Sequence, residues 1–249
     1  MASERPVVLL HAFPLNATLW RPQVEAGPVG WRVVTPDLPG FGASSEPPTA
    51  TMDDMARGIL RALDGLGIQR AVIGGLSMGG YLTLALYRMA PERFSGMIPA
   101  DTRATPDTEE QKAGRRKMIT TVREQGPPAI ADEMLPKLLG ATSQRERPSL
   151  AGTVRAMIEG NRADAIAGAV EAIMGRPDST PLLPSIAVPT LVLCGDEDVL
   201  TPPSDSEALR RGIRGSRLVM LPRAGHLSNI EAPEAFSAAL QDFLAPLES

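Results

Sequence analysis

The chain has 249 residues, 43% of them hydrophobic, which fits one large domain or one domain with an insertion and is ample for a buried core. Its formal net charge is −4, from 25 basic and 29 acidic residues without a long run of one sign, so we expect no binding to nucleic acid or to a membrane. The single cysteine, Cys194, excludes an internal disulfide framework, no Cys/His cluster has the spacing of metal ligands, and no apolar run approaches the roughly 18 residues of a membrane span.

The first five residues are polar and lead straight into an apolar run without the layout of a signal peptide, so we expect a soluble, cytoplasmic protein. Short apolar runs rich in β-branched residues then recur along the chain. They are continuous rather than alternating, which is typical of parallel strands covered on both faces. The runs are residues 6–10, 32–35, 70–74, 96–100, 189–194 and 217–221. Pro99 is awkward in the fourth run, because proline has no N–H to donate within a central strand.

Helical patterns lie between these runs. Residues 52–63 carry apolar side chains at a spacing of three and four, and Thr51 precedes them as an N-cap. A second helix is expected from Ser77 to Met89, and the last from Pro233 to about Leu244. This alternation of strand and helix predicts an α/β fold with a mostly parallel, doubly wound sheet.

Residues 104–183 interrupt the alternation. No β-branched run occurs there, and proline-punctuated helical stretches replace it. We expect these helices around residues 109–124, 128–139, 149–159 and 164–174. The segment is interpreted as a helical insertion into an α/β core made of residues 1–103 and 184–249, while ordinary crossover helices of the same sheet remain an alternative.

A candidate nucleophile lies in the sequence Gly75-Leu76-Ser77-Met78-Gly79, which follows the third strand and opens a helix. A serine on such a sharp turn has a strained backbone, and small residues two positions away let the neighbouring elements approach. Its hydroxyl then stands at the carboxyl edge of the sheet, where open α/β sheets bind ligands. The N–H of Met78, at the helix N-terminus, can bind developing negative charge.

Serine needs a base, and the chain has only His11 and His226. His226 follows the last strand, so it belongs to the same sheet edge and is the candidate base. Asp196, Glu197 and Asp198 follow the fifth strand and compete as the group that orients the imidazole. We interpret Asp196 and Glu197 as a charged turn, which leaves the order Ser77, Asp198, His226.

These motifs together resemble the α/β-hydrolase superfamily, and the resemblance covers nearly the whole core. His11-Ala12-Phe13-Pro14 is similar to the oxyanion loop of the family, residues 37–44 to its second glycine-rich loop, and Gly225-His226 to its histidine loop. Within residues 195–202 the resemblance selects Asp198 as the catalytic acid. It further implies a structural role for His11, oxyanion-binding N–H groups on Phe13 and Met78, and a cap over the serine at residues 104–183.

One residue departs from the family pattern. Ala12 stands where glycine is usual, and it would be strained if that position needs a positive φ.

The stretch Asp101-Thr102-Arg103-Ala104 and the helices after it are similar to enol-lactonase-like members of the superfamily. The resemblance to carboxylesterases and enol-lactonases implies acyl transfer from a small carboxylic ester or lactone to water, with no metal or organic cofactor. Ser77 argues against haloalkane dehalogenases and epoxide hydrolases, which use aspartate. Carbon–carbon bond hydrolases, cofactor-free perhydrolases and low-turnover ligand-binding modules of this fold remain alternatives. Arg103 and the cluster Arg115-Arg116-Lys117 could attract a carboxylate on the substrate, but for the cluster we prefer the interpretation of a solvated helix face. The oligomeric state stays open.

Overall fold

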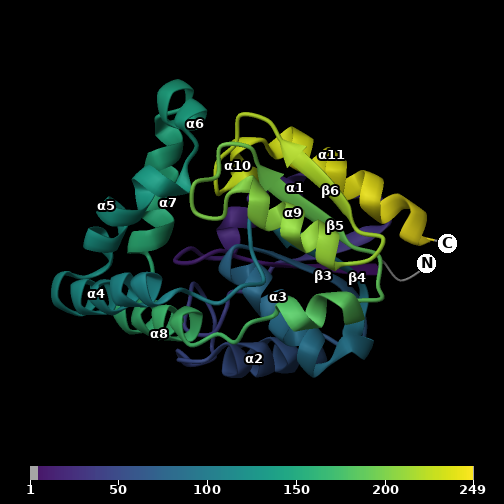
Figure 1. The fold of residues 1–249 in the computed structure, drawn as a ribbon, viewed down its shortest axis with the longest axis horizontal. Coiled ribbons are helices and arrows are strands. Elements are labelled where there is room, and N and C mark those ends of the chain that lie inside the picture. Colours follow the sequence, from purple (N-terminus) through teal and green to yellow (C-terminus); the bar gives the residue numbers. More distant parts are fainter. Residues whose placement is uncertain (1–4, 249) are drawn as a thin grey trace.

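The computed structural model describes residues 5–248, which form one six-stranded sheet with helices around it (Figure 1). The strand order is β2-β1-β3-β4-β5-β6, and every neighbouring pair is parallel. The strands are β1 (Arg5–Leu10), β2 (Trp31–Val34), β3 (Ala71–Leu76), β4 (Phe94–Ala100), β5 (Leu191–Gly195) and β6 (Arg217–Leu221). Each contains most of one predicted apolar run, so the predicted parallel α/β sheet is confirmed.

Burial explains the continuous apolar runs. Every residue of β3 and β5 is buried, because helices cover both faces of the inner sheet. The edge strand β6 keeps several partly or fully exposed side chains and has only one buried residue, Leu221. Apolar side chains of strands and helices form one continuous core.

Pro99 does lie in a central strand, and the sheet accommodates it by loosening the pair β4 and β5. The N–H groups of Met97 and Asp101, two residues to either side, donate to carbonyls of the segment that contains β5. The backbone nitrogen of Pro99 points to the same side but has no hydrogen to donate. Regular pairing between the two strands is limited to Ala100 opposite Leu193, with an isolated bridge at Met97. The missing donor therefore costs one rung of this ladder.

Helices α2 (Met52–Gly65) and α3 (Met78–Met89) pack against each other on one side of the sheet, while α1 (Arg21–Ala26) and α11 (Pro233–Leu244) pack together on the other (Figure 1). Helix α9 (Pro203–Gly212) contacts β5 and β6, and the short α10 (Ser228–Glu231) precedes α11. The predicted cap of α2 is present, since the Thr51 hydroxyl accepts the N–H of Asp54 at 3.1 Å.

Five α-helices lie between β4 and β5 and form a group beside the sheet (Figure 1). They are α4 (Glu109–Gln125), α5 (Pro127–Leu138), α6 (Ala141–Glu146), α7 (Ser149–Glu159) and α8 (Ala163–Met174). Four of them match the predicted helical stretches, whereas α6 was not expected. Of the described helices, none combines the length and hydropathy needed to cross a membrane.

Candidate active site

Four polar side chains from four different loops meet at the carboxyl edge of the sheet. Ser77 follows β3, Asp101 follows β4, Asp198 comes three residues after β5, and His226 lies five residues beyond β6. Because all strands are parallel, their carboxyl ends face one edge, where open α/β sheets bind their ligands. The loops that follow β3, β5 and β6 are those in which the sequence predicted chemistry.

Ser77 occupies a strained turn. Its φ of 56° and ψ of −111° lie in a region that residues with a side chain rarely adopt. Its N–H donates to the carbonyl of Ala100 at 2.9 Å, which ties the turn to the end of β4. A Cβ atom on Gly75 would lie 2.3 Å from Gly79, and one on Gly79 only 2.1 Å from the carbonyl oxygen of Leu10. Both glycines are therefore required by close backbone approach, as the sequence pattern predicted.

The structure brings Ser77, His226 and Asp198 into one hydrogen-bonded chain. Nε2 of His226 lies 2.8 Å from Oγ of Ser77, and Nδ1 lies 2.8 Å from Oδ2 of Asp198. His226 is 2% exposed and Asp198 is 3% exposed, whereas Ser77 is partly accessible. In the neutral imidazole with its proton on Nδ1, Nε2 is free to accept the serine proton.

Asp198 is held by more than the imidazole. Its Oδ1 accepts the N–H groups of Leu200 at 2.8 Å and Thr201 at 3.0 Å, and its Oδ2 accepts the Thr201 hydroxyl at 2.7 Å. Burial alone would raise the pKa of Asp198, but attraction to His226 and these hydrogen bonds lower it below the usual value. The carboxylate is therefore ionised at neutral pH.

His226 responds in the opposite direction. Burial alone would lower the pKa of this imidazole, but the charge and hydrogen bond of Asp198 outweigh it, and the resulting pKa is raised above the ordinary value. A stronger base accepts a proton from a hydroxyl more readily. Asp198 thus stabilises the imidazolium form that proton transfer would create.

Two backbone N–H groups near Ser77, those of Phe13 and Met78, have no hydrogen-bond partner among the described residues. Met78 is the first residue of α3, so its N–H has no partner within the helix. Phe13 and Ser77 line the same cavity. Unpaired donors of this kind are what a developing oxyanion requires.

His11 is fully buried and holds two loops together. Its Nδ1 donates to the carbonyl of Ala12 at 3.0 Å, and its Nε2 accepts the N–H of Leu38 at 3.0 Å. Burial lowers the pKa of His11 to about 4, so this imidazole is neutral. Ala12 is not among the residues with a positive φ, so its side chain causes no strain of the kind considered above.

Asn161, which the sequence did not single out, connects the helical insertion to the loops around the site. Its amide nitrogen donates to the carbonyls of Pro14 at 2.9 Å and Leu15 at 3.1 Å, and its Oδ1 accepts the N–H of Gly42 at 3.0 Å. A buried asparagine after a helix has no sequence signature. Only its tertiary neighbours identify it.

A cavity of about 210 Å³ opens above Ser77. Core residues form its floor, and the helical insertion contributes apolar side chains and charged groups to its walls. The insertion residues include Met118, Met134 and Ile173 together with Arg115, Glu133 and Lys137, and Arg103 also lines the space.

Arginine side chains converge on one buried carboxylate beside this cavity. Oδ1 of Asp107 lies 3.1 Å from Arg103 and 2.8 Å from Arg176, while its Oδ2 lies 3.1 Å from Arg115. Burial works against ionisation of Asp107, but the guanidinium groups lower its pKa below the ordinary value. One negative charge therefore faces three positive charges, and Nε of Arg103 is buried without a hydrogen-bond partner.

The α/β-hydrolase fold family matches this chain over residues 5–233. A 3-oxoadipate enol-lactonase of Acinetobacter baylyi is 30% identical, over 96% of this chain and 88% of the relative. A pimeloyl-[acyl-carrier protein] methyl ester esterase of Neisseria meningitidis is also 30% identical, with coverage of 96% and 93%.

Solved structures agree with these matches. A thermophilic esterase from Thermogutta terrifontis, with malate bound, has a TM-score of 0.95 at 41% identity, covering 98% of this chain and 91% of that one. The enol-lactonase from Burkholderia xenovorans has a TM-score of 0.90 at 31% identity, with coverage of 98% and 92%. The motifs, the parallel sheet and these matches extend over nearly the whole chain, which therefore belongs to the α/β-hydrolase fold family.

Proposed function

We propose that this protein is a serine hydrolase that cleaves a small carboxylic ester or lactone through an acyl-enzyme. The observation that carries the proposal is the hydrogen-bonded chain from Ser77 through His226 to Asp198 at the carboxyl edge of the sheet. Nucleophile, base and orienting acid are the three groups that acyl transfer by serine needs. The hydrolases among the relatives support this reaction class, and the small-molecule substrate fits the cavity above Ser77.

In the proposed cycle, Nε2 of His226 removes the Ser77 proton while Oγ attacks the carbonyl carbon. The N–H groups of Phe13 and Met78 bind the resulting oxyanion. His226 then gives its proton to the leaving alcohol oxygen, which departs and leaves the acyl group on Ser77. Water, deprotonated by His226, attacks the acyl carbon, and the acid product is released as Ser77 recovers its proton.

Residues 104–183 serve in this proposal as a cap whose helices shape the substrate cavity. Met118, Met134 and Ile173 would contact the apolar part of the substrate. The cap is anchored to the core loops by Asn161.

The alternatives on the same three residues are carbon–carbon bond hydrolysis, perhydrolysis and ligand binding with little turnover. Hydrolysis of p-nitrophenyl acetate and butyrate, together with covalent labelling of Ser77 by a fluorophosphonate, separates the proposed reaction from ligand binding with little turnover. Folded protein that neither turns over these esters nor reacts with the label would favour the binding module.

The pH dependence of ester hydrolysis should report the His226 titration. Because only the neutral imidazole accepts the serine proton, kcat/KM should rise with pH through a midpoint above the ordinary histidine pKa of about 6.5. Asp198→Asn removes the charge that raises the pKa of His226. It should therefore move the midpoint to lower pH and reduce kcat by about 10⁴-fold. An unchanged midpoint in this variant would contradict the assignment of Asp198.

The substrate is further proposed to carry a carboxylate. Arg103 and Arg115 line the cavity, and Asp107 neutralises only part of the positive charge around it. Arg116 and Lys117, the other members of the basic cluster, are exposed and do not line the cavity. A substrate carboxylate would gain charge-assisted hydrogen bonds from guanidinium groups, each worth about 1.5–3 kcal/mol.

Arg115→Gln should raise KM about tenfold for the p-nitrophenyl half-ester of glutaric acid, because one charge-assisted contact is lost. The uncharged p-nitrophenyl valerate, of the same chain length, should be hydrolysed by this variant as by the wild type. Arg116→Gln, on the exposed face of the same helix, is the matched control and should leave the KM for both substrates unchanged. Equal losses on both substrates in Arg115→Gln would argue against a carboxylate-binding role.

A further inference from the structure

Three consecutive residues at the end of β4, Ala100 to Thr102, contact all the loops that carry the proposed catalytic residues. The Ala100 carbonyl accepts the N–H of Ser77 at 2.9 Å, and the Thr102 hydroxyl donates to the carbonyl of Ser77 at 2.8 Å. Asp101, between them, turns the other way. Its Oδ1 accepts the N–H of Gly195 at 2.8 Å, and its Oδ2 is hydrogen-bonded to the hydroxyl of Ser228.

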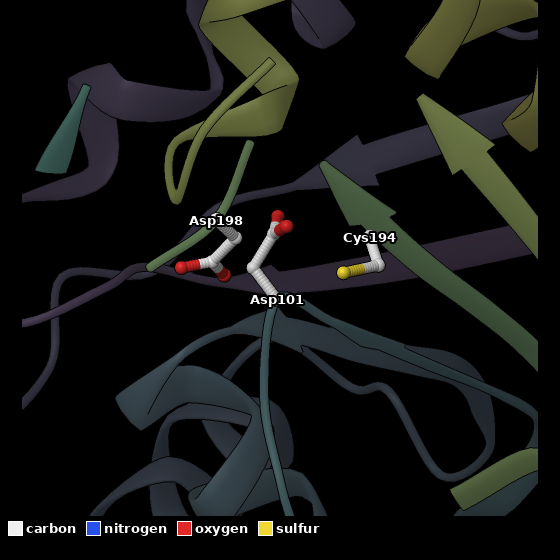
Figure 2. Close-up of side chains that lie close together, drawn as sticks. All are labelled: Asp101, Cys194 and Asp198. Atoms are coloured by element: carbon white, nitrogen blue, oxygen red, sulfur yellow. The ribbon is translucent and has the colours of Figure 1, made fainter. Parts of the chain in front are cut away.

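The partners of Asp101 lie close to the other two catalytic candidates. Gly195 ends β5 and begins the turn that carries Asp198, while Ser228 is two residues beyond His226. The Asp101 side chain stands between Asp198 and Cys194 where β4 and β5 end (Figure 2). A single carboxyl group thus joins the acid-bearing turn to the histidine-bearing turn, next to the segment that holds Ser77.

The backbone of Asp101 adopts an uncommon conformation that places its side chain between the two turns. Its φ of 44° is in the left-handed region, where aspartate is tolerated but uncommon. Its N–H donates to the carbonyl of Leu193 at 2.9 Å, which fixes the residue to β5. Strained conformations persist only where their surroundings hold them in place, and they gather at functional sites.

The charge state of Asp101 follows from its neighbours. Its side chain is fully buried, and the titratable groups around it are Asp198, Cys194 and His226. One carboxylate oxygen of Asp101, one of Asp198 and the Sγ atom of Cys194 all lie within 4.8 Å of one another. Asp198 has the imidazole as its partner, whereas Asp101 is hydrogen-bonded only to a backbone N–H and a hydroxyl. Burial, and then the negative charge of Asp198, raise the pKa of Asp101 well above its usual value.

The same three side chains do not form a convincing metal site. The side-chain oxygens of Asp101 and Asp198 already take part in hydrogen bonds with N–H and O–H groups of the protein. Burial raises the pKa of the Cys194 thiol, so the thiolate that a metal would need does not form at neutral pH. The cluster is better explained by hydrogen bonding within the protein.

We propose that Asp101 is a positioning residue that aligns the turns of Asp198 and His226 with Ser77, and that it does so as an uncharged carboxylic acid. The proposal rests on the proposed function, because it presupposes that these three residues form a triad. Protonated Asp101 donates to the Ser228 hydroxyl through Oδ2 and accepts from Gly195 through Oδ1. Asp198 is then the only carboxylate hydrogen-bonded to the imidazole, and Glu231 contributes a weaker charge from farther along the histidine-bearing turn. A second charge would hold His226 in its protonated form to higher pH and make it unavailable as a base near neutrality.

Asp101→Asn tests the uncharged form, because an amide reproduces the hydrogen bonds of a carboxylic acid. Its oxygen accepts from Gly195, its nitrogen donates to Ser228, and asparagine tolerates a positive φ. We expect kcat to stay within about threefold of the wild type. Asp101→Ala leaves the Gly195 N–H unpaired and should lower kcat by about 10- to 100-fold with little change in KM.

The His226 pKa provides a second measurement that needs no substrate. The chain has only two histidines, so NMR titration of isotope-labelled imidazoles resolves His226 from His11. In Asp101→Asn the pKa of His226 should match the wild type, because no charge has been removed. Asp196→Asn is the control for removal of an exposed charge, because Asp196 lies on the surface of the same turn as Asp198. This variant should also leave the pKa of His226 unchanged.

The possible outcomes separate the parts of the proposal. A fall in the His226 pKa by about one unit in Asp101→Asn would show that Asp101 is charged and would overturn the uncharged form. Full kcat in a folded Asp101→Ala variant would overturn the positioning role. Failure of the wild type to hydrolyse any ester or to react with a fluorophosphonate would instead count against the proposed function, and the NMR titration would still decide the charge of Asp101.

Discussion

Ser77→Ala should lower kcat for p-nitrophenyl butyrate by about 10⁴- to 10⁶-fold, the range found when a serine nucleophile is removed from a triad. The alanine has no hydroxyl to attack the carbonyl, whereas the oxyanion donors and the cavity remain. Purified variant and wild type should be compared in the same ester assay, and the variant should no longer react with a fluorophosphonate.

The stability of the Ser77 variants provides the control for this experiment. Alanine at φ 56° retains the strain of the turn, so the melting temperature should be close to that of the wild type. Ser77→Gly relieves that strain and should be at least as stable as Ser77→Ala while equally inactive. Normal esterase activity in folded Ser77→Ala would refute the proposed mechanism.

His226→Ala should have an effect of similar size, with kcat reduced by about 10⁴- to 10⁶-fold. No other imidazole can replace it, because both ring nitrogens of His11 are hydrogen-bonded and burial lowers its pKa to about 4. The measurement is the kcat of the variant at a pH above the midpoint of the wild-type profile, where the neutral base predominates.

The double variant Ser77→Ala/His226→Ala sharpens this test. When two residues act as one unit, the losses caused by removing each do not add. The kcat of the double variant should therefore lie within a few fold of the kcat of the less active single variant. Losses that multiply would show that the two residues act independently, contrary to a shared proton transfer. Activity that survives His226→Ala alone would require a different base.

Local sequence patterns predicted most of the fold because they follow from short-range physics. Continuous apolar runs indicated strands buried on both faces, and capping residues and proline marked helix ends. Pro99 shows the limit of this reasoning. A central proline is unfavourable by itself, yet the sheet tolerates it where β4 and β5 pair at only one regular position and one isolated bridge. That tolerance depends on a neighbouring strand about ninety residues away.

The candidate site was predictable in part for a related reason. Ser77, Asp198 and His226 each follow a strand, and parallel strands end at one edge. Asp101 follows a strand as well, but no sequence pattern assigned it a role beside the other three residues. The basic cluster was interpreted as a solvated helix face, and only the orientation of α4 separates Arg115 at the cavity from the exposed Arg116.

The sequence by itself determined the class of fold, the residues available for the proposed acyl transfer and the scarcity of alternatives to His226 as a base, because composition, spacing and motif order express these directly. Tertiary structure decided the rest. It placed Nε2 of His226 at 2.8 Å from the Ser77 hydroxyl, buried Asp101 beside Asp198, and gathered arginines around Asp107. These contacts join residues far apart in the chain, and their distances and charge states depend on packing and desolvation that no local pattern encodes.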